Sequence, residues 1–433
     1  MDGQLKVGTI LRAESSNNYK VVALLGAGGQ GEVYDVECNK KHYALKWYFK
    51  HMATREQKAI LDNLISRGAP DDSFLWPQDM IFTSYGESFG YIMPLRPKQY
   101  KSIVDLMKRR AEPTFYALCR AAYNLTNGYE KLHSMGYSYR DISFGNVFFD
   151  PKNGDVLICD NDNVSANGAT DSSVYGTPRF MAPEIVTGKA KPSRNTDLFS
   201  LAVLLFYMFM MGHPLEGKLE ADIKCMDIHA MNKLYGTDPV FVFDPDNKTN
   251  RPVRGYQDNL LIFWDIYPQS VRDLFIQSFT VGLTNPGRRV TEKKWLDTFA
   301  NLMSGITLCR CKAEVFYDEQ KAAQGIGQQC WNCQKNVGFP ASIITGKSRV
   351  LLTKDVKLYA HHIYGNYDMQ TVVGTVVQNP NRPELLGIRN ETAENWTYIK
   401  PDGQQIPVAG GRTAAIVKGA KIDFGQNVGC FEA

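Results

Sequence analysis

The 433-residue chain has no long apolar run and no excess of charge of one sign. Its most apolar stretch, residues 198–211, is too short to span a bilayer and follows Asp197, so we expect a buried helix there. The 49 basic and 45 acidic residues leave a net charge of +4, which gives no reason to expect a nucleic-acid or membrane partner. Residues 1–6 show no apolar segment of the secretory kind, which predicts a cytoplasmic protein.

A glycine-rich motif near the N-terminus indicates a flap over phosphates. Gly26, Gly28 and Gly31, followed by Val33, fit the pattern G-x-G-x-x-G-x-V. Glycines let a backbone turn approach phosphates closely and aim its N–H groups at them. The dinucleotide-binding fingerprint shares the first six positions but needs a helix immediately afterwards. Here residues 32–37 alternate like a strand and a second strand is expected over 42–47, which favours the flap.

Lys46 lies on that second strand, where a lysine can pair with the α- and β-phosphates of a nucleotide. Without the flap it would be interpreted as an exposed edge lysine. A phosphate-binding lysine needs a carboxylate to orient it. Residues 54–57 have the form of a capping box at the start of an amphipathic helix, so Glu56 is the candidate partner and Asp62 the alternative.

The segment 139–146 carries the carboxylate of Asp141 and the amide of Asn146 on a predicted loop. Phosphoryl transfer needs one group to accept the proton of the nucleophile and another to hold a metal on the phosphates. Asp and Asn also occur in loops for turn formation alone. The catalytic interpretation of Asp141 and Asn146 therefore depends on the ordered motifs around them. These motifs include Asp160, which follows the apolar run 156–158.

With these motifs in this order, residues 10–305 resemble the eukaryotic-type (Hanks-type) Ser/Thr protein kinases of bacteria. The resemblance implies an α+β bilobal kinase domain over 1–305, with an N-lobe of about 1–95 and a C-lobe of about 96–305. It implies transfer of the γ-phosphoryl group of ATP to protein hydroxyls, including those of the enzyme itself. By resemblance, Asp141 is the catalytic base, Asn146 and Asp160 hold Mg²⁺, and Lys46 with Glu56 completes the catalytic set.

The resemblance extends to the later motifs of the kinase domain. Residues 176–184 read G-T-P-R-F-M-A-P-E, close to the end of the family's activation segment. Glu184 is then expected to pair with Arg289, and Asp197 to anchor the backbone of the catalytic loop. Thr177 resembles the threonine of Ser/Thr-specific members.

An adenine site is implied over residues 91–96, with Met93 at the gate and a backbone donor at Arg96. Val33 and Ala44 would cover the base from above and Phe148 from below. The residues implied to bind the nucleotide are Gly26, Gly28, Gly31, Val33, Ala44, Lys46, Met93, Pro94, Arg96 and Phe148.

The chain departs from the family at four positions. Tyr139 replaces a histidine, and Ser143 replaces a lysine that neutralises the γ-phosphate, a change that removes transition-state stabilisation if nothing compensates. Asn161 and Asp162 replace the Phe and Gly of D-F-G, and Asp162 is either an extra metal ligand or a solvated turn residue. These changes motivate two alternatives, a nucleotide-binding pseudokinase scaffold and a small-molecule kinase. The intact Lys46, Asp141, Asn146 and Asp160 favour an active enzyme, and the protein-type segment 176–184 opposes the small-molecule reading.

Arg140 precedes the candidate base, where a phosphorylated loop residue can dock and order the segment. Ser173 is the best-placed candidate phosphosite and Thr170 is another. An unmodified polar loop is the alternative.

Four of the nine cysteines cluster in two pairs, Cys309 with Cys311 and Cys330 with Cys333. This spacing predicts a tetrahedral zinc site in a ribbon-like module over 306–337. A disulfide is disfavoured in a reducing compartment. Four thiolate ligands leave no open position, so the predicted role of the zinc is structural.

After a linker over 338–347, residues 348–433 show short apolar runs broken by Gly, Asn and Pro, which predicts an all-β sandwich. Its later part, residues 386–425, resembles the second half of a forkhead-associated domain. That family reads phosphothreonine through an early arginine and serine, and no matching pattern occurs here. His361 and His362 are adjacent and are interpreted as surface or packed imidazoles.

The three-part chain resembles a bacterial kinase group found beside a metal-dependent phosphatase and a von Willebrand A-type protein, which implies these partners in addition to a protein substrate.

Overall fold

The computed structural model describes residues 4–82, 88–168 and 176–432. It divides into two compact units. The first contains Met1–Trp264 and Asp273–Leu296, and the second contains Asp265–Arg272 and Asp297–Ala433. We describe each unit by itself.

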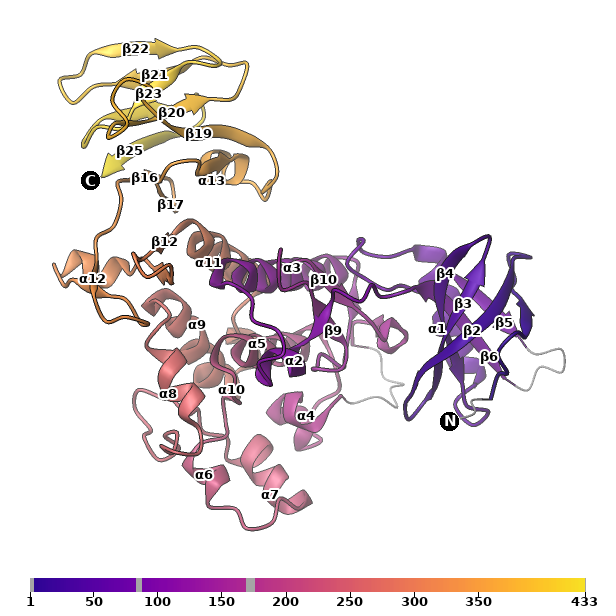
Figure 1. Cartoon of the computed structure of the whole chain (residues 1–433). Coiled ribbons are helices and arrows are strands. Elements are labelled where there is room, and N and C mark those ends of the chain that lie inside the picture. The colour runs from indigo at the N-terminus through magenta and orange to yellow at the C-terminus, as the bar shows by residue number, and fades with distance from the viewer. Residues whose placement is uncertain (1–3, 83–87, 169–175, 433) are drawn as a thin grey trace. The chain divides into compact units, whose positions relative to one another are not determined.

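The first unit begins with a six-stranded antiparallel sheet in the order β1-β2-β3-β4-β6-β5, accompanied by helix α1 (Figure 1). The alternation of buried and exposed side chains along β3 turns Tyr34 and Val36 into the core. The strand–turn–strand–strand order expected around the glycine motif is confirmed by β2, β3 and β4. The bounds are β1 Ile10–Arg12, β2 Asn18–Ala27, β3 Gly31–Cys38, β4 Lys41–Tyr48, α1 Arg55–Arg67, β5 Asp79–Phe82 and β6 Phe89–Pro94.

Helices dominate the rest of this unit. The apolar run after Asp197 forms α5 (Arg194–Met210), in which every residue from Thr196 to Met210 is buried, as the sequence predicts. Helix α3 (Phe115–Ser134) packs beside it, and the hairpin of β9 (Val147–Phe149) and β10 (Val156–Ile158) follows the catalytic-loop segment. The remaining elements are β7 Lys101–Ser102, α2 Ile103–Met107, β8 Tyr137–Ser138, β11 Ser165–Ala166, α4 Pro183–Val186, α6 Lys218–Ala221, α7 Ile228–Asn232, α8 Asp258–Trp264, α9 Gln269–Phe279, α10 Val281–Thr284 and α11 Glu292–Ser304.

The second unit shares helices α9 and α11 with the first and continues after Ser304 with two small hairpins. Strands β12 (Ile306–Leu308) and β13 (Glu314–Phe316) form the first, and β14 (Gln328–Gln329) and β15 (Asn336–Val337) form the second. Helix α12 (Glu319–Ala323) lies between them in sequence. Each hairpin carries one of the two cysteine pairs in its turn.

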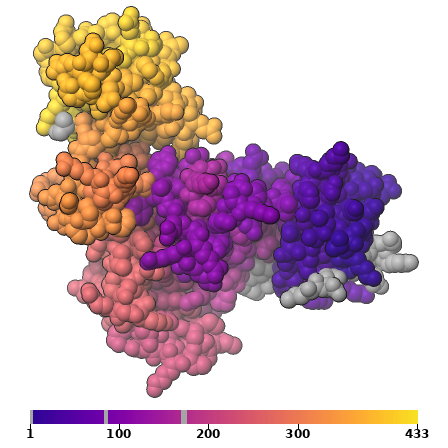
Figure 2. Space-filling view, in the orientation of Figure 1, coloured from indigo at the N-terminus to yellow at the C-terminus, as the bar shows by residue number. Residues whose placement is uncertain are grey.

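A β-sandwich completes the second unit, with a six-stranded sheet in the order β17-β16-β25-β24-β21-β22 and a four-stranded sheet in the order β18-β19-β20-β23. Trp396, which is fully buried, lies in its core with apolar residues from both sheets. In the space-filling view the sandwich is one closely packed body (Figure 2). The bounds are β16 Ser342–Thr345, β17 Ser348–Leu351, β18 Lys357–Tyr359, α13 Ala360–Tyr364, β19 Val372–Gln378, β20 Leu386–Asn390, β21 Trp396–Ile399, β22 Gln405–Val408, β23 Thr413–Ala415, β24 Lys421–Asp423 and β25 Val428–Glu432.

Two sequence expectations for this region need comment. The linker expected over 338–347 contains strand β16, which pairs with both β17 and β25 and is therefore an inner strand of the sandwich. Its four residues are too few for an alternating pattern to show in the sequence. His361 and His362 are packed rather than exposed, both on the short helix α13.

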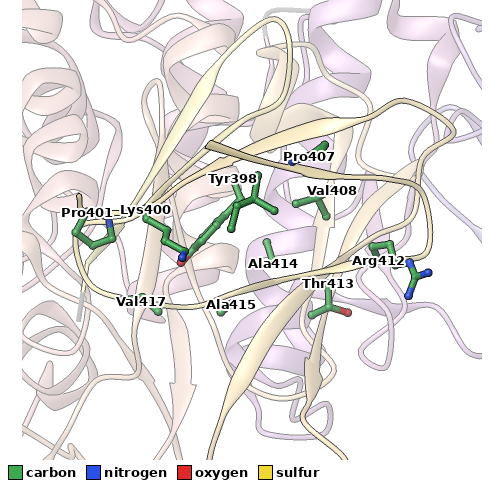
Figure 3. Close-up of a pocket in the computed structure, with 11 residues that line it drawn as sticks. Tyr398, Lys400, Pro401, Pro407, Val408, Arg412, Thr413, Ala414, Ala415 and Val417 are labelled. Carbon is green, nitrogen blue, oxygen red and sulfur yellow. The ribbon is translucent and has the colours of Figure 1, made fainter. Parts of the chain in front are cut away.

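The sandwich has a hollow of about 410 Å³ beside β22 and β23, each the last strand of its sheet (Figure 3). Its lining is mostly apolar, with Lys400 and Arg412 as its cations. The lining residues are Tyr398, Lys400, Pro401, Ile406, Pro407, Val408, Arg412, Thr413, Ala414, Ala415 and Val417.

Across the part of the chain that the structure describes, no helix has the length and apolar character needed to cross a membrane.

Candidate active site

Asp141 and Asn146 lie on the loop between β8 and β9, and their side chains are in contact. The amide nitrogen of Asn146 donates to the main-chain oxygen of Asp141 at 2.8 Å and to its Oδ2 at 3.1 Å. The N–H and the hydroxyl of Thr177 donate to Oδ1 of Asp141 at 2.9 and 2.8 Å. Both oxygens of the carboxylate are therefore held in place by donors.

The catalytic loop is fixed to helix α5 by Asp197, as predicted. Its carboxylate accepts the N–H of Tyr139 at 2.6 Å and the N–H of Arg140 at 3.0 Å. Tyr139 is fully buried, stacks edge-on against Tyr129, and donates its hydroxyl to the carbonyl of Cys159. The tyrosine thus joins the loop to the residue before Asp160.

A buried ionic chain that the sequence analysis missed supports the same anchor. His133 contacts Asp197 through Nε2 at 3.0 Å and Glu292 through Nδ1 at 2.5 Å, and Arg194 reaches Glu292 at 2.8 Å. Burial alone would lower the pKa of His133, but its two carboxylate partners raise it to about 9. Burial would raise the pKa of Glu292, but hydrogen bonds from His133 and Arg194 lower it to about 2. These residues are far apart in sequence, and no local pattern connects them.

Lys46 on β4 forms its ion pair with Asp162, not with Glu56. Its Nζ lies 2.8 Å from Oδ2 and 3.0 Å from Oδ1 of Asp162, and 3.5 Å from Oδ1 of Asp160. The amide oxygen of Gln30, in the glycine-rich turn, accepts from the same nitrogen at 3.0 Å. The lysine thereby connects the flap to the loop that carries Asp160.

Glu56 is exposed in the first turn of α1, and its interactions are local ones around the N-cap Thr54. The alternative, Asp62, is also exposed and pairs with Lys58 at 2.7 Å. The residue of this turn that reaches the site is Gln57, whose Nε2 donates to the hydroxyl of Tyr48 at 3.1 Å. The predicted helix start is confirmed, since the side chain of Thr54 accepts the N–H of Gln57, and the residue of this turn that points inward is Gln57.

Asp162 is buried rather than solvated. Its side chain has no accessible surface, and it accepts hydrogen bonds from the hydroxyls of Tyr48 and Tyr91. Burial would raise its pKa, but the charge of Lys46 lowers it, so the buried carboxylate stays ionised. The interpretation of Asp162 as a solvated turn residue is therefore wrong, because its carboxylate is a buried partner of the lysine.

Asn161 occupies the position of the family's phenylalanine and is also fully buried. Its amide nitrogen donates to the carbonyls of Leu75 at 2.9 Å and Ile158 at 3.0 Å. Hydrogen bonds to backbone therefore fix this loop where the family uses apolar packing. Ser143 is buried, and its hydroxyl is neutral. It therefore does not supply the positive charge of the lysine that the family carries at this position.

Asn146 and Asp160 offer oxygen donors that suit Mg²⁺. The amide nitrogen of Asn146 is used by Asp141, which leaves its carbonyl oxygen for a cation. The Asp160 side chain is 40% exposed, and the N–H of Cys159 donates to the carbonyl of Asn146 at 3.0 Å, so the backbone segments that carry the two residues lie side by side. Burial and the charge of Asp162 raise the pKa of Asp160 against the opposing effect of Lys46, and a bound cation would relieve this.

The nucleotide-contact residues expected from the sequence come mostly from five strands, β2, β3, β4, β6 and β9. Ala44 on β4 is paired with Met93 on β6, and both are buried in one apolar cluster with Val33. Phe148 lies on β9, and the guanidinium of Arg96 covers its ring at 4.0 Å. Leu157, paired with Phe148 across the hairpin, joins the same cluster and was not anticipated. Gly26 and Gly31 lie on β2 and β3, Gly28 in the turn between them, and Pro94 ends β6.

The end of the activation segment is pinned to the C-lobe. Arg289 donates two hydrogen bonds to Glu184 at 2.7 and 2.8 Å, which confirms the predicted pair. Arg140 is buried and donates to the carbonyl of Asn163 at 2.5 Å. The candidate phosphosites Thr170 and Ser173 lie outside the described residues.

A family model of the protein kinase domain matches residues 19–297, and the chain therefore belongs to the protein kinase family. It is 30% identical over 217 residues to a probable Ser/Thr-protein kinase, CCRP1, of Zea mays. Among bacterial relatives it is 25% identical over 257 residues to the Ser/Thr-protein kinase PknD of Chlamydia abortus, and 24% identical over 318 residues to the protein kinase YegI of Escherichia coli. These matches cover 48%, 52% and 68% of this chain, but only 34%, 27% and 46% of the three relatives.

The cysteines of the second unit form a separate candidate metal centre. The sulfur atoms of Cys309, Cys311, Cys330 and Cys333 all lie within 4.8 Å of one another. In each hairpin turn the residue after the second cysteine, Lys312 or Gln334, has a positive φ and donates its N–H to the carbonyl of the first cysteine. The shorter C-x-C turn and the longer C-x-x-C turn thus present their sulfurs to one point.

Proposed function

We propose that the chain is an ATP-dependent Ser/Thr protein kinase that transfers the γ-phosphoryl group of ATP to protein hydroxyls, its own included. The observation that carries the proposal is the fixed carboxylate of Asp141, held by Asn146 and Thr177. A substrate hydroxyl beside this carboxylate would give its proton to it as the hydroxyl oxygen attacks the γ-phosphorus of ATP, and the bond from that phosphorus to the β–γ bridging oxygen would break to release ADP. Asn146 and Asp160 would hold Mg²⁺, which would supply positive charge against the phosphates. Lys46 would hold the α- and β-phosphates, with adenine between Val33, Ala44 and Phe148.

The choice of hydroxyl substrates of the Ser/Thr kind rests on Thr177. Its hydroxyl and N–H both bind the base, so the segment 176–184 is drawn against the catalytic loop. Because Thr177 also stands where the sequence resembles the threonine of Ser/Thr-specific kinases, this contact supports serine and threonine substrates over tyrosine.

The experiment is incubation of the purified chain with γ-labelled ATP and Mg²⁺, beside Asp141→Ala and Asp160→Ala. We expect label on protein serine or threonine in the wild type and a loss of at least about 100-fold in each variant. Label that persists in both variants would refute the assignment.

A nucleotide-binding scaffold without transfer is the second candidate, favoured by the buried Ser143 where the family has a lysine. It predicts stabilisation by Mg·ATP of about 2.7 kcal/mol at 100 times Kd, with no transfer of label. The two functions are thus separated by the same labelled incubation combined with a melting curve.

For the second unit we propose a structural zinc ion on Cys309, Cys311, Cys330 and Cys333. We also propose that the β-sandwich, whose sequence resembles a forkhead-associated domain, places protein substrates. The implied partners, a metal-dependent phosphatase and a von Willebrand A-type protein, would make the phosphorylation reversible. Pull-down with each candidate partner, with and without residues 348–433, tests this arrangement.

A further inference from the structure

We propose that Asp162 is the positioning residue of Lys46, replacing a carboxylate on helix α1, and that it does not bind the metal. The proposal rests on the assignment of Lys46 to the phosphates of ATP made above. In this proposal the carboxylate of Asp162, on the loop after β10, sets the position of Lys46.

The first support is the burial of the pair. The side chain of Asp162 is 0% exposed and that of Lys46 is 7% exposed, and both carboxylate oxygens contact Nζ. Removing one partner of such a pair leaves an uncompensated charge away from water, which is strongly unfavourable. Each group therefore keeps the other in place.

The second support is the pair of tyrosines that close the network. Tyr48 follows Lys46 by two residues on β4, so both side chains point to the same face of the sheet, and Tyr91 lies opposite Lys46 in the β4–β6 register. Both hydroxyls donate to Asp162. If Asp162 turned away to bind a metal, it would leave two buried hydroxyls and a buried ammonium without this acceptor.

The third support is the composition of helix α1 at this point. Gln57 contacts the hydroxyl of Tyr48 and the carbonyl of Asp162, at 3.1 and 3.4 Å, and it is a neutral amide. The acidic residues Glu56 and Asp62 are exposed. The helix thus supplies a hydrogen-bonding amide behind the pair, and the loop supplies the charge.

One consequence separates this chain from kinases that orient the lysine from a helix. Asp162 lies two residues from Asp160, so the lysine partner and the expected metal ligand belong to one short loop. The phosphate-binding lysine and the metal site should therefore move together, and displacement of α1 alone should not release Lys46.

The test begins with a double-mutant cycle on the nucleotide-free full chain, measured as melting temperature. Lys46→Met and Asp162→Asn should each lower the melting temperature. The loss in the double variant should be well below the sum of the two single losses. Lys46→Met with Glu56→Gln should be additive. Additive losses for Lys46 and Asp162, or coupling between Lys46 and Glu56, would overturn the proposal. If a charge variant does not fold, the cycle of Tyr48→Phe with Tyr91→Phe replaces it, because each removes one hydroxyl from Asp162 without stranding a charge.

The second measurement separates positioning from metal binding. The affinity for the non-hydrolysable analogue AMP-PNP is followed as Mg²⁺ is added. Asp160→Asn should need more Mg²⁺ for half-maximal binding, whereas Asp162→Asn should need the wild-type amount. A rightward shift for Asp162→Asn equal to that for Asp160→Asn would make Asp162 a metal ligand and refute the proposal.

A kinetic measurement completes the set where the wild type transfers phosphate. We expect Asp162→Asn to lower kcat by roughly 10- to 100-fold, with a smaller change in KM for ATP. An unchanged kcat would contradict the proposal. If the wild type transfers nothing, the proposed function fails, while the melting cycle and the Mg²⁺ titration still decide the role of Asp162.

Discussion

At the scale of single residues, the site carries the lysine, carboxylates and amide that the family resemblance implies, but different residues support them. A tyrosine at 139 reaches the carbonyl of Cys159, and an asparagine at 161 binds two backbone carbonyls. Directional hydrogen bonds thus do what apolar packing does elsewhere in the family, and they tolerate less displacement, because a hydrogen bond weakens steeply with misalignment. We expect the metal loop of this chain to be fixed more by polar contacts than by shape.

The His133–Glu292 pair makes a prediction about pH. The pKa of His133 is raised from 6.5 to about 9, so its contribution to stability is complete below pH 6.5 and is lost as the pH rises through about 9. The pKa of Glu292 is lowered from 4.5 to about 2, so its contribution is complete above pH 4.5 and is lost as the pH falls through about 2. Between pH 6.5 and 9.5 the unfolding free energy should fall by on the order of 3 kcal/mol.

Denaturant unfolding of the wild type and of His133→Gln across this pH range checks the prediction. The variant should be less stable at pH 6.5 and should show a flatter dependence on pH. His229→Gln serves as the control, because His229 is exposed. A wild-type profile that stays flat to pH 9.5 would contradict the assigned partner geometry.

At the scale of elements, the glycine-rich hairpin depends on one close backbone approach. A Cβ at Gly31 would lie 2.1 Å from the carbonyl oxygen of Trp47 on β4, whereas nothing lies within 4 Å of a Cβ at Gly29. The third glycine of the motif is therefore required by the packing of β3 on β4. Nothing lies within 4 Å of a Cβ at the second, Gly28, so packing does not require a glycine there.

Gly31→Ala should destabilise the chain by about 1–3 kcal/mol, because the backbone of β4 must shift to make room. It should also weaken nucleotide binding, since the flap moves with the strand. Gly29→Ala should match the wild type in melting temperature. Equal melting of the two variants, seen by calorimetry, would show that the β3–β4 contact is looser than the structure has it.

At the scale of the whole molecule, the chain joins a kinase domain to a cysteine module and a β-sandwich. The cysteine hairpins bury few apolar side chains, with Val315 and two cysteines as the buried members of their cluster. A module of this size gains little from burial, and bound metal would supply most of its folding free energy. We therefore expect the folding of residues 306–337 to depend on bound zinc.

Elemental analysis should find about one zinc per chain. Cys330→Ser should lose the metal and expose residues 306–337 to proteases, while Cys225→Ser, at an exposed free thiol, should keep both the metal and the resistance. Metal content well under one per chain in the wild type would remove the zinc proposal.

The sequence by itself determined the order of the phosphate-handling motifs, the buried helix α5, the strands around the glycines and the two closely spaced pairs of cysteines. These are local patterns, since periodicity, turn residues and spacing act over a few neighbours along the chain. It also led to the pair of Glu184 and Arg289 through the family resemblance.

Only the tertiary structure decided which carboxylate faces Lys46, because that choice depends on how β4, β6, α1 and the loop after β10 meet. Asp162 and Lys46 are 116 residues apart, and His133 and Glu292 are 159 apart. The strand β16 was also settled in this way, by its pairing with the end of the chain at β25. Which charged residues pair depends on their distance and burial in the folded protein. The spacing of residues along the chain specifies neither quantity.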